Sequence, residues 1–361
     1  MEIRAIEFFS GIGGLHHGLT HARPSATVAA AFDVNVVANS VYAHNFPSTP
    51  VLPAAIDHLT PATIARWRAN TWLLSPPCQP FTRGGKALDH LDDRSRGLLH
   101  LIGLLPRLDT PPQFLFLENV KGFETSRCRH LLVRQLRALQ YEVVECLVEP
   151  TAVGVPNTRL RYFLLARRRR DTPVEATPDA ADLNASGETE PLDLQTSWPV
   201  TWSSTSSSSP LPVTPVRPLS DFLDADENPA SVVPEQWIRK SHKFNFDLVT
   251  PNAQRSSTFT KSYGSKHIFG SGSFIVSSLP DAGDDSAMHD NVGTILSLKP
   301  RFFTPSEVAR LHSFPPTLSF PEDVSRDQQY RLLGNSLNVL VVGELLKVLF
   351  AAVSESETGS D

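Results

Sequence analysis

One short loop carries the side chain best suited to covalent chemistry, the thiol of Cys78. The loop, Ser75-Pro76-Pro77-Cys78-Gln79-Pro80-Phe81, follows the apolar run 71–74, which predicts a buried strand. Its prolines fix φ and remove backbone donors, so we expect the thiol on a stiff loop outside any helix or sheet ladder. A lone cysteine is more often a small buried hydrophobe, but a cysteine at the mouth of a strand is placed to act as a nucleophile.

A carboxylate and two guanidinium groups are predicted at the same edge of the sheet. Residues 114–117 form a continuous apolar strand of the kind buried on both faces, and Glu118 follows it directly. Because ligands of open α/β sheets bind at the carboxyl ends of the strands, we expect Glu118 and Cys78 to share a site. Arg159 and Arg161 are two residues apart at the start of another apolar run, so they would lie on one face of a strand. Because the rest of the run is apolar, this favours a polar pocket over the alternative of a solvated strand face.

The N-terminal part of the chain has the pattern of a nucleoside-binding α/β domain. A predicted strand over 3–9 enters the turn Ser10-Gly11-Ile12-Gly13-Gly14, whose glycines let a ligand approach the backbone. Asp33 ends the next predicted strand, where such domains place the carboxylate that binds ribose, and Asp57 follows a third apolar segment. Each feature alone fits a tight turn, a surface carboxylate or a helix cap, but their spacing is that of βα units in a doubly wound sheet.

Composition indicates an ordinary globular protein. Its 361 residues, 40% of them hydrophobic, suffice for one large domain and a smaller one. We find no signal-peptide pattern and no apolar run of membrane-spanning length, so we expect a cytoplasmic protein, with the nucleus as a second location. Cys78, Cys128 and Cys146 lack metal-ligand spacing, which favours a reducing compartment and no metal site. The net charge of −5 means that any basic footprint for nucleic acid must be local.

Composition also divides the chain into segments. We expect a catalytic cofactor-binding domain over 1–170, a flexible Ser/Pro-rich linker or insertion over 171–218, a smaller domain over 219–320, and a segment over 321–361 that returns to the first domain. Residues 258–267 mix aromatic, glycine and basic side chains, which suits nucleic-acid contact, although an irregular small β domain is the simpler alternative. A capping box at Thr304 and Glu307 predicts the start of a helix.

Five motifs resemble those of the cytosine carbon-5 methyltransferase superfamily and occur in that family's order. They are Glu7-Phe8-Phe9-Ser10-Gly11-Ile12-Gly13-Gly14, Pro77-Cys78-Gln79-Pro80, Glu118-Asn119-Val120, Arg159-Leu160-Arg161 and Gly334-Asn335-Ser336. Within the superfamily, segments 75–83, 119–124, 156–163 and 332–339 are most similar to the eukaryotic tRNA (aspartate) cytosine-5 methyltransferases, historically classed as a second DNA methyltransferase. That family usually carries Cys-Phe-Thr where this chain has Thr258-Phe259-Thr260.

The resemblance implies an α/β, Rossmann-like S-adenosylmethionine-dependent methyltransferase fold with a target-recognition domain over 219–320. It implies that the Cys78 thiolate attacks carbon 6 of a cytosine and that Glu118 holds the ring through N3 and the exocyclic amine. Arg159 and Arg161 would hold the target nucleotide and lower the pKa of the thiol. No metal is implied. The implied cofactor-binding residues are Ser10, Gly11, Ile12, Gly13, Gly14, Asp33, Val34, Ile56, Asp57, Ser75, Asn335 and Ser336.

The implied substrate is tRNA, at the cytosine in position thirty-eight of the anticodon loop of aspartate tRNA. We expect contacts to the RNA from basic and aromatic side chains, namely Arg83, Lys86, Lys121, Lys261, Tyr263 and Lys266. A DNA cytosine-5 methyltransferase is the nearest alternative, and a catalytically silent nucleic-acid-binding homologue is the alternative of another class. We expect a monomer that contacts no membrane and for which DNA is at most a weak partner.

Overall fold

The computed structural model describes residues 1–81, 88–169, 190–202, 214–225, 231–240, 246–266, 268–279 and 292–351. The chain forms two compact units, the first from Met1–Val148, Leu160–Leu211 and Val341–Asp361, and the second from Glu149–Arg159 and Pro212–Leu340. Residues 149–159, which we predicted in the first domain, belong to the second unit. They are tied to it by long-range contacts such as the bond from Thr158 N to Ser256 O, at 2.8 Å.

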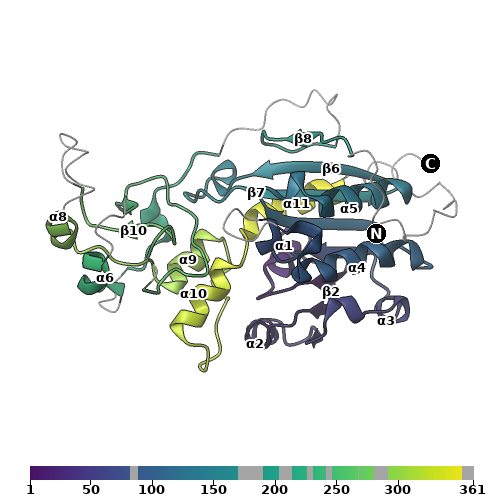
Figure 1. Cartoon of the computed structure of the whole chain (residues 1–361), viewed down its shortest axis with the longest axis horizontal. Coiled ribbons are helices and arrows are strands. Elements are labelled where there is room, and N and C mark those ends of the chain that lie inside the picture. Colours follow the sequence, from purple (N-terminus) through teal and green to yellow (C-terminus); the bar gives the residue numbers. More distant parts are fainter. Residues whose placement is uncertain are drawn as a thin grey trace. The chain divides into compact units, whose positions relative to one another are not determined.

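The described part of the first unit is built on an eight-stranded sheet with the order β3-β2-β1-β4-β5-β7-β6-β8 (Figure 1). Strands β1 to β5 pair in parallel, whereas β7 is antiparallel to both of its neighbours. The strands are β1 (Arg4–Phe8), β2 (Thr27–Phe32), β3 (Val51–Leu52), β4 (Thr71–Leu74), β5 (Phe114–Val120), β6 (Tyr141–Val148), β7 (Arg161–Arg168) and β8 (Leu194–Gln195). This sheet confirms the predicted α/β, Rossmann-like fold class.

The strand order reverses direction at β1, which determines where a ligand can bind. From β1 the chain builds outward to β2 and β3 on one side, and then returns to place β4 and β5 on the other. At such a reversal the connections diverge, and a crevice opens at the carboxyl ends of the strands. Ser10 and Ser75 follow β1 and β4 closely, so the predicted glycine turn and nucleophile loop both lie at this crevice.

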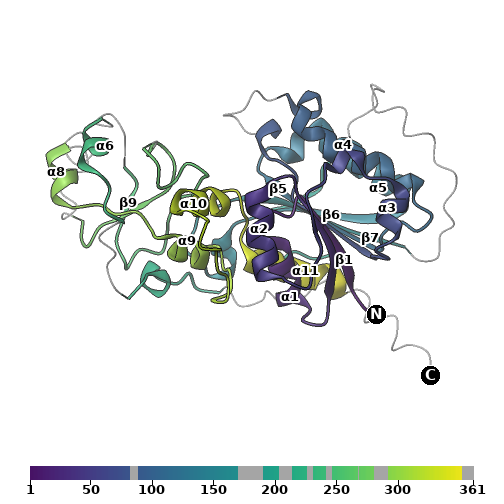
Figure 2. The ribbon, with the colours of Figure 1, turned by 90° about the horizontal axis from the view of Figure 1, so that it is seen from below.

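Helices cover both faces of the sheet (Figure 2). On one face, α4 (Arg96–Leu104) and α5 (Arg127–Ala138) contribute their leucines to the main hydrophobic cluster. On the other face lie α1 (Gly14–Ala22) and α11 (Val339–Ala351), where a Cβ at Gly18 would overlap Val342. The remaining helices of the described part of this unit are α2 (Val36–Asn45) and α3 (Pro61–Ala65).

The last helix, α11, is apolar because it is buried in the first unit. Five of its side chains are at most 1% exposed, namely Val341, Val342, Leu345, Leu346 and Leu349. The stretch Arg326–Ala351 is long and apolar enough to cross a membrane by composition, but 61% of its most apolar window is buried within the protein. A helix that is apolar all round and covered by protein is typical of a core helix.

Part of the Ser/Pro-rich segment is folded, which corrects the prediction of a flexible linker across 171–218. Residues 190–202 contain β8, which pairs with β6, and Trp202, whose ring nitrogen donates to Val348 O at 2.8 Å. The buried Arg129 guanidinium also donates to the carbonyls of Glu190 and Pro191, at 2.7 and 3.0 Å. These contacts order a segment whose composition lacks the apolar periodicity of a helix or strand. Residues 171–189 and 203–213 of the predicted linker lie outside the described residues.

The described part of the second unit has a core of aromatic rings and little sheet. Its helices and strands are α6 (Glu235–Lys240), α8 (Val292–Ser297), α9 (Pro305–Leu311), α10 (Arg326–Gly334), β9 (Leu248–Val249) and β10 (Phe274–Ile275). Phe259, Tyr263, Phe274, Phe302 and Phe303 are at most 4% exposed, and their contacting rings lie 4.9 to 6.2 Å apart. Such pairs stabilise a core beyond the area they bury.

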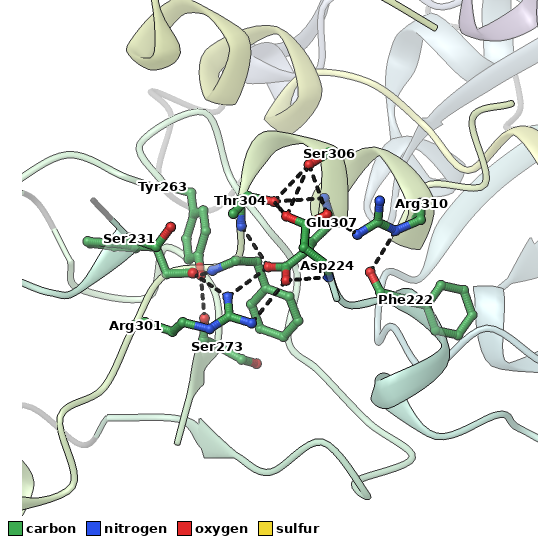
Figure 3. Close-up of polar contacts among 12 residues, drawn as sticks. Phe222, Asp224, Ser231, Tyr263, Ser273, Arg301, Thr304, Ser306, Glu307 and Arg310 are labelled. Carbon is green, nitrogen blue, oxygen red and sulfur yellow. Dashed lines mark hydrogen bonds and ion pairs between the residues drawn. The ribbon is translucent and has the colours of Figure 1, made fainter. Parts of the chain in front are cut away.

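A buried ion pair fixes the start of α9 (Figure 3). Glu307 is fully buried and accepts hydrogen bonds from both terminal nitrogens of Arg301, at 2.8 and 2.9 Å. Its carboxylate also accepts from Thr304 N, which completes the predicted capping box, and from Asp224 N at 2.9 Å. Removing one partner would leave a buried charge uncompensated, so these groups act as one structural unit.

Candidate active site

The loop that carries Cys78 is held by the neighbouring strand. Asn119, near the end of β5, donates from Nδ2 to Pro76 O at 3.1 Å. Beyond the thiol, Phe81 N donates to Cys78 O at 3.0 Å, and the Phe81 ring packs edge-on against Phe123 at 4.9 Å. The thiol is partly exposed, on a loop outside the sheet ladder, as the prolines predict.

Cys78 is the accessible thiol among the three cysteines, all of which the structure describes. Cys128 and Cys146 are 0% exposed, and burial raises the pKa of both thiols well above the usual range. Because the thiolate is the reactive form of cysteine, these two side chains are unsuited to nucleophilic attack at neutral pH. Of the three thiols, that of Cys78 is therefore the one suited to act as a nucleophile.

Glu118 lies beside the nucleophile loop because β4 and β5 are neighbouring parallel strands. Leu74 pairs with Leu117, so the next residues leave the sheet together, and Ser75 Oγ donates to Glu118 Oε2 at 2.9 Å. From β7, Arg161 Nε lies 3.6 Å from Glu118 Oε1. The carboxylate, 7% exposed, thus has a hydroxyl donor and a cation beside it. Both groups fix the orientation of the carboxylate.

Arg94 is a charged neighbour of Cys78 that we did not predict from the sequence. Its pKa is raised mainly by the hydrogen bond to Asp92, against a smaller effect of desolvation, and further by the charges of Asp92 and Cys78. The charge of Arg94 therefore acts at Cys78 as well as at Asp92. Asp92 holds Arg94 through bonds of 2.8 and 2.6 Å. In the sequence, Asp92-Asp93-Arg94 reads as an ordinary helix start, and no local pattern links it to residue 78.

The glycine turn after β1 forms a cradle beside Asp33. Gly11 N donates to Asp33 Oδ2, and Asn35 N donates to Oδ1, both at 2.8 Å. Gly11 has φ +53° and open space where a Cβ would stand. Ser10 Oγ is buried and has no hydrogen-bond partner among the described residues. An open backbone, a carboxylate with remaining lone pairs and an unsatisfied hydroxyl fit a ligand that contains ribose.

Glu7, on β1, is a buried carboxylate. It is 0% exposed, and its Oε2 accepts from the Tyr42 hydroxyl at 2.8 Å. Its Oε1 has no hydrogen-bond partner among the described residues. A carboxylate buried with a single donor is costly to ionise.

Glu7 should also make stability depend on pH. Burial raises its pKa from 4.5 to about 8, so between these values the folded chain holds a proton that the unfolded chain has released. The free energy of unfolding therefore falls as pH rises through this range. His16 has the opposite effect, since burial lowers its pKa from 6.5 to about 3, but that effect is complete above pH 6.5.

We expect Glu7→Gln, which cannot ionise, to flatten the pH dependence of stability above pH 6.5. In the wild type, the free energy of unfolding should fall by about 2 kcal/mol between pH 6.5 and pH 8, because each pKa unit corresponds to about 1.4 kcal/mol. Urea denaturation at the two pH values measures the difference. An equal decline in the variant would show that another group causes it.

Four further residues of the first unit that we predicted to bind cofactor differ in how exposed their side chains are. Val34 is 68% exposed and directly follows Asp33, and Asp57 is partly exposed. Ile12 and Ile56 are 2% and 5% exposed, so their side chains serve the core and their backbone alone could reach a ligand.

The other three members of that set, Gly13, Gly14 and Ser75, have structural roles in the described residues. Gly13 has φ +85°, and a Cβ there would lie 2.6 Å from the Phe46 ring, so this glycine is required for packing. Gly14 is the first residue of α1. Ser75 donates to Glu118, which makes it a partner of the carboxylate.

Arg159 belongs to the second unit and does not share a strand face with Arg161, which corrects our prediction. Strand β7 begins at Arg161. Arg159 is 3% exposed and donates to Phe259 O at 3.1 Å, to Gly334 O at 3.2 Å and to Ser336 O. These bonds hold the 334–336 motif against residue 259, and the predicted contact of Arg159 with the target nucleotide stays a prediction. Asn335 is exposed, and its predicted contact with the cofactor stays a prediction, as does that of Ser336.

Tyr263 is a core residue, which corrects its predicted contact with RNA. Its side chain is 2% exposed, and its hydroxyl donates to Ser273 O at 2.6 Å and accepts from Phe303 N at 2.9 Å. An aromatic ring beside lysines in sequence suits base stacking, but here the packing of the aromatic core holds it. The lysines predicted to contact RNA, Lys121, Lys261 and Lys266, are exposed, whereas Arg83 and Lys86 lie outside the described residues.

Comparisons with known proteins agree with this geometry. Residues 3–351 match the sequence model of a family described as C-5 cytosine-specific DNA methylase. A Homo sapiens protein named tRNA (cytosine(38)-C(5))-methyltransferase is 36% identical, over 96% of this chain and 99% of its own length. A Dictyostelium discoideum protein named DNA (cytosine-5)-methyltransferase is 32% identical, over 98% and 96%. The crystal structure of a Spodoptera frugiperda DNMT2 mutant has a TM-score of 0.77 at 37% identity, covering 96% of this chain and 99% of its own.

Proposed function

The chain belongs to the C-5 cytosine-specific DNA methylase family, and from this we propose that it transfers a methyl group from S-adenosylmethionine to carbon 5 of a cytosine in tRNA. The observation that carries the proposal is the placement of Cys78 and Glu118 after neighbouring parallel strands, β4 and β5. A nucleophile and an oriented carboxylate at one sheet edge match what methylation of an unreactive ring carbon requires.

Cys78 serves as the nucleophile. Carbon 5 of cytosine does not attack a methyl donor readily, so a thiolate first adds to carbon 6. The new S–C6 bond pushes an electron pair toward carbon 5, and N3 takes a proton from solvent, which balances the proton that the thiol released to solvent on becoming a thiolate. The proline-stiffened loop limits the directions from which sulfur can attack.

Glu118 stabilises the ring in the state that forms during this attack. As an ionised carboxylate it accepts hydrogen bonds from N3–H and from the exocyclic amine, and it pairs best with a ring that carries the extra proton. Ser75 and Arg161 fix its orientation. The interaction therefore strengthens as the thiolate adds, which is how it lowers the barrier.

The bound cofactor would supply the methyl group that carbon 5 takes up. The residues that fit it are Gly11 with its open backbone, Asp33 for the ribose hydroxyls and Ser10 with its unsatisfied hydroxyl. Loss of the carbon-5 proton and departure of the Cys78 sulfur then restore the aromatic ring.

Asp33→Ala should weaken cofactor binding by about tenfold or more, because a hydrogen bond to a charged group contributes about 1.5–3 kcal/mol. Asp33→Asn is the matched control, since its amide oxygen can still accept from Gly11 N, and we expect a smaller loss. Isothermal titration calorimetry with S-adenosylmethionine measures both. Unchanged affinity in Asp33→Ala would place the ribose elsewhere.

Three features support tRNA as the substrate, and specifically the cytosine at position thirty-eight of aspartate tRNA. The Homo sapiens relative is named for this position in tRNA. With a net charge of −5, phosphate attraction must come from local basic patches, which suit a compact folded RNA better than a long regular duplex. An anticodon loop also presents its bases partly unstacked, which lowers the cost of bringing one to Cys78.

Two other functions are alternatives, and each predicts a different result in the turnover experiment described below. The Dictyostelium discoideum relative, named as a DNA methyltransferase, supports activity on DNA. A catalytically silent homologue would be expected to lack the nucleophile, the ring-holding acid or the glycine turn, and this chain keeps all three.

The proposed function is tested by turnover on the two nucleic acids under one condition. Purified protein and labelled cofactor are incubated with aspartate tRNA, or with duplex DNA of equal cytosine content, at the same salt concentration. We expect methyl transfer to tRNA and little to DNA. Comparable rates on both would favour the DNA methyltransferase function, and no transfer to either would favour the silent homologue.

A further inference from the structure

The second unit contains a cavity of about 430 Å³ whose lining mixes charges and hydroxyls. Its lining residues are Lys261, Ser262, Tyr263, Ser265, Asp327 and Arg331. They come from the turn after Thr260 and from one side of α10, at positions four residues apart on the helix. The volume is in the range of small-ligand sites and would accommodate one nucleotide.

The walls of the cavity are fixed by close packing. A Cβ on Gly334 would overlap the backbone of Thr260 and Lys261, and a Cβ on Gly264 would overlap the Tyr330 ring, so the turn rests directly on α10. Within the turn, Ser265 Oγ donates to Ser262 O at 2.7 Å. A site built in this way is preformed, so little ordering free energy is lost on binding.

Three charged side chains at this cavity are exposed and have no ion-pair or side-chain hydrogen-bond partner among the described residues. They are Lys261, Asp327 and Arg331. Their helical neighbour Arg326 differs, since it donates to Ser231 Oγ at 3.2 Å and to Tyr330 Oη at 3.0 Å. The three charges are therefore available to a ligand rather than engaged in holding the unit together.

The arrangement of charges indicates which ligand fits. Two cations suit a phosphate. A carboxylate beside them repels phosphate, so Asp327 is favourable in a complex only if it accepts a hydrogen bond from the ligand. The 2′-hydroxyl of ribose is such a donor, and it is the group that distinguishes RNA from DNA. The serine hydroxyls add further polar contacts for a sugar.

We propose that this cavity binds one ribonucleotide of the RNA substrate, with its phosphate on Lys261 and Arg331 and its ribose 2′-hydroxyl on Asp327. The proposal rests on tRNA being the substrate and adds a reason for that preference. Because the contact is to ribose, the preference for RNA does not depend on the base sequence at this nucleotide. Asp327 is then a specificity-determining residue outside the catalytic groups Cys78 and Glu118.

The test compares ribose and deoxyribose at single positions. Binding is measured by filter retention of an RNA stem-loop with the anticodon-loop sequence of aspartate tRNA, and of copies with one 2′-deoxy substitution each. We expect one substitution to weaken binding to the wild type by about tenfold, the loss of one charge-assisted hydrogen bond. In Asp327→Ala, which has no side-chain acceptor, the all-ribose RNA should bind about as weakly as the 2′-deoxy RNA binds to the wild type, and the same 2′-deoxy substitution should cause little further loss. Asp323→Ala, a change at an exposed residue of the same unit, is the matched control and should behave as the wild type.

The two cations give an independent readout. Lys261→Gln and Arg331→Gln should weaken RNA and 2′-deoxy copies alike, and each should reduce the slope of log affinity against log salt by about 0.7. Lys299→Gln, exposed in the same unit, is the control. Equal or tighter RNA binding by Asp327→Ala, or an unchanged 2′-deoxy effect in that variant, would overturn the proposal. Failure of the wild type to methylate tRNA would instead overturn the proposed function, and the binding comparison would still decide what the cavity does.

Discussion

Replacing Cys78 with alanine should abolish methyl transfer while leaving cofactor binding nearly unchanged. The thiol forms the covalent bond to the substrate ring, so its loss removes the step that makes carbon 5 reactive. The glycine turn and Asp33 follow β1 and β2 rather than β4, and their mutual hydrogen bonds do not involve the nucleophile loop. Single-turnover methyl transfer and calorimetry on the same preparation measure the two properties.

Cys128→Ala is the matched control for this experiment. Its thiol is 0% exposed, and burial raises its pKa, so we expect that variant to lose some stability but to keep methyl transfer. Turnover of Cys78→Ala near the wild-type rate would mean that another group is the nucleophile, and the mechanism proposed above would then be wrong.

Replacing Glu118 with glutamine should lower kcat/KM by about 10² to 10⁴, the range typical of removing a group that stabilises charge or a proton in the transition state. Glutamine keeps the shape but carries no charge, so it cannot pair with a ring protonated at N3. The effect should lie mainly in kcat, because the interaction is strongest after the thiolate has added.

Ser75→Ala serves as the graded comparison for Glu118→Gln. It removes one hydrogen bond to the carboxylate and leaves Arg161 in place, so we expect a reduction of about tenfold. Rapid-quench kinetics on tRNA separates binding from chemistry for both variants. A rise in KM with unchanged kcat in Glu118→Gln would show that the carboxylate binds substrate without assisting the reaction.

The sheet and the neighbouring positions of Ser75 and Glu118 could be predicted from the sequence, because the carboxyl ends of parallel strands meet at one edge of a sheet. Each of the two apolar runs is followed by a polar residue. The pairing of Leu74 with Leu117 places Ser75 Oγ 2.9 Å from Glu118 Oε2. The Asp33 contact with the glycine turn followed from the same rule. In these cases a local pattern and a general topology were enough.

The errors concern side chains whose partners are distant in sequence. Arg159 was predicted to share a strand face with Arg161, but it lies outside β7 and donates to carbonyls one hundred or more positions further along the chain. Tyr263 is held by aromatic packing, and residues 190–202 are ordered by Arg129 and Val348. Arg94 lies near Cys78 only because of the fold. No periodicity or motif near these residues encodes such contacts.

The most direct test of the central claim is to map the methylated cytosine when both nucleic acids compete. The wild type is incubated with total tRNA, genomic DNA and S-adenosylmethionine in one reaction, and bisulfite sequencing is performed on both, with Cys78→Ala as the blank. We expect new methylation at the anticodon-loop cytosine of aspartate tRNA and none above the blank in DNA. Methylation that appears in the DNA while the tRNA stays unmodified would contradict the account.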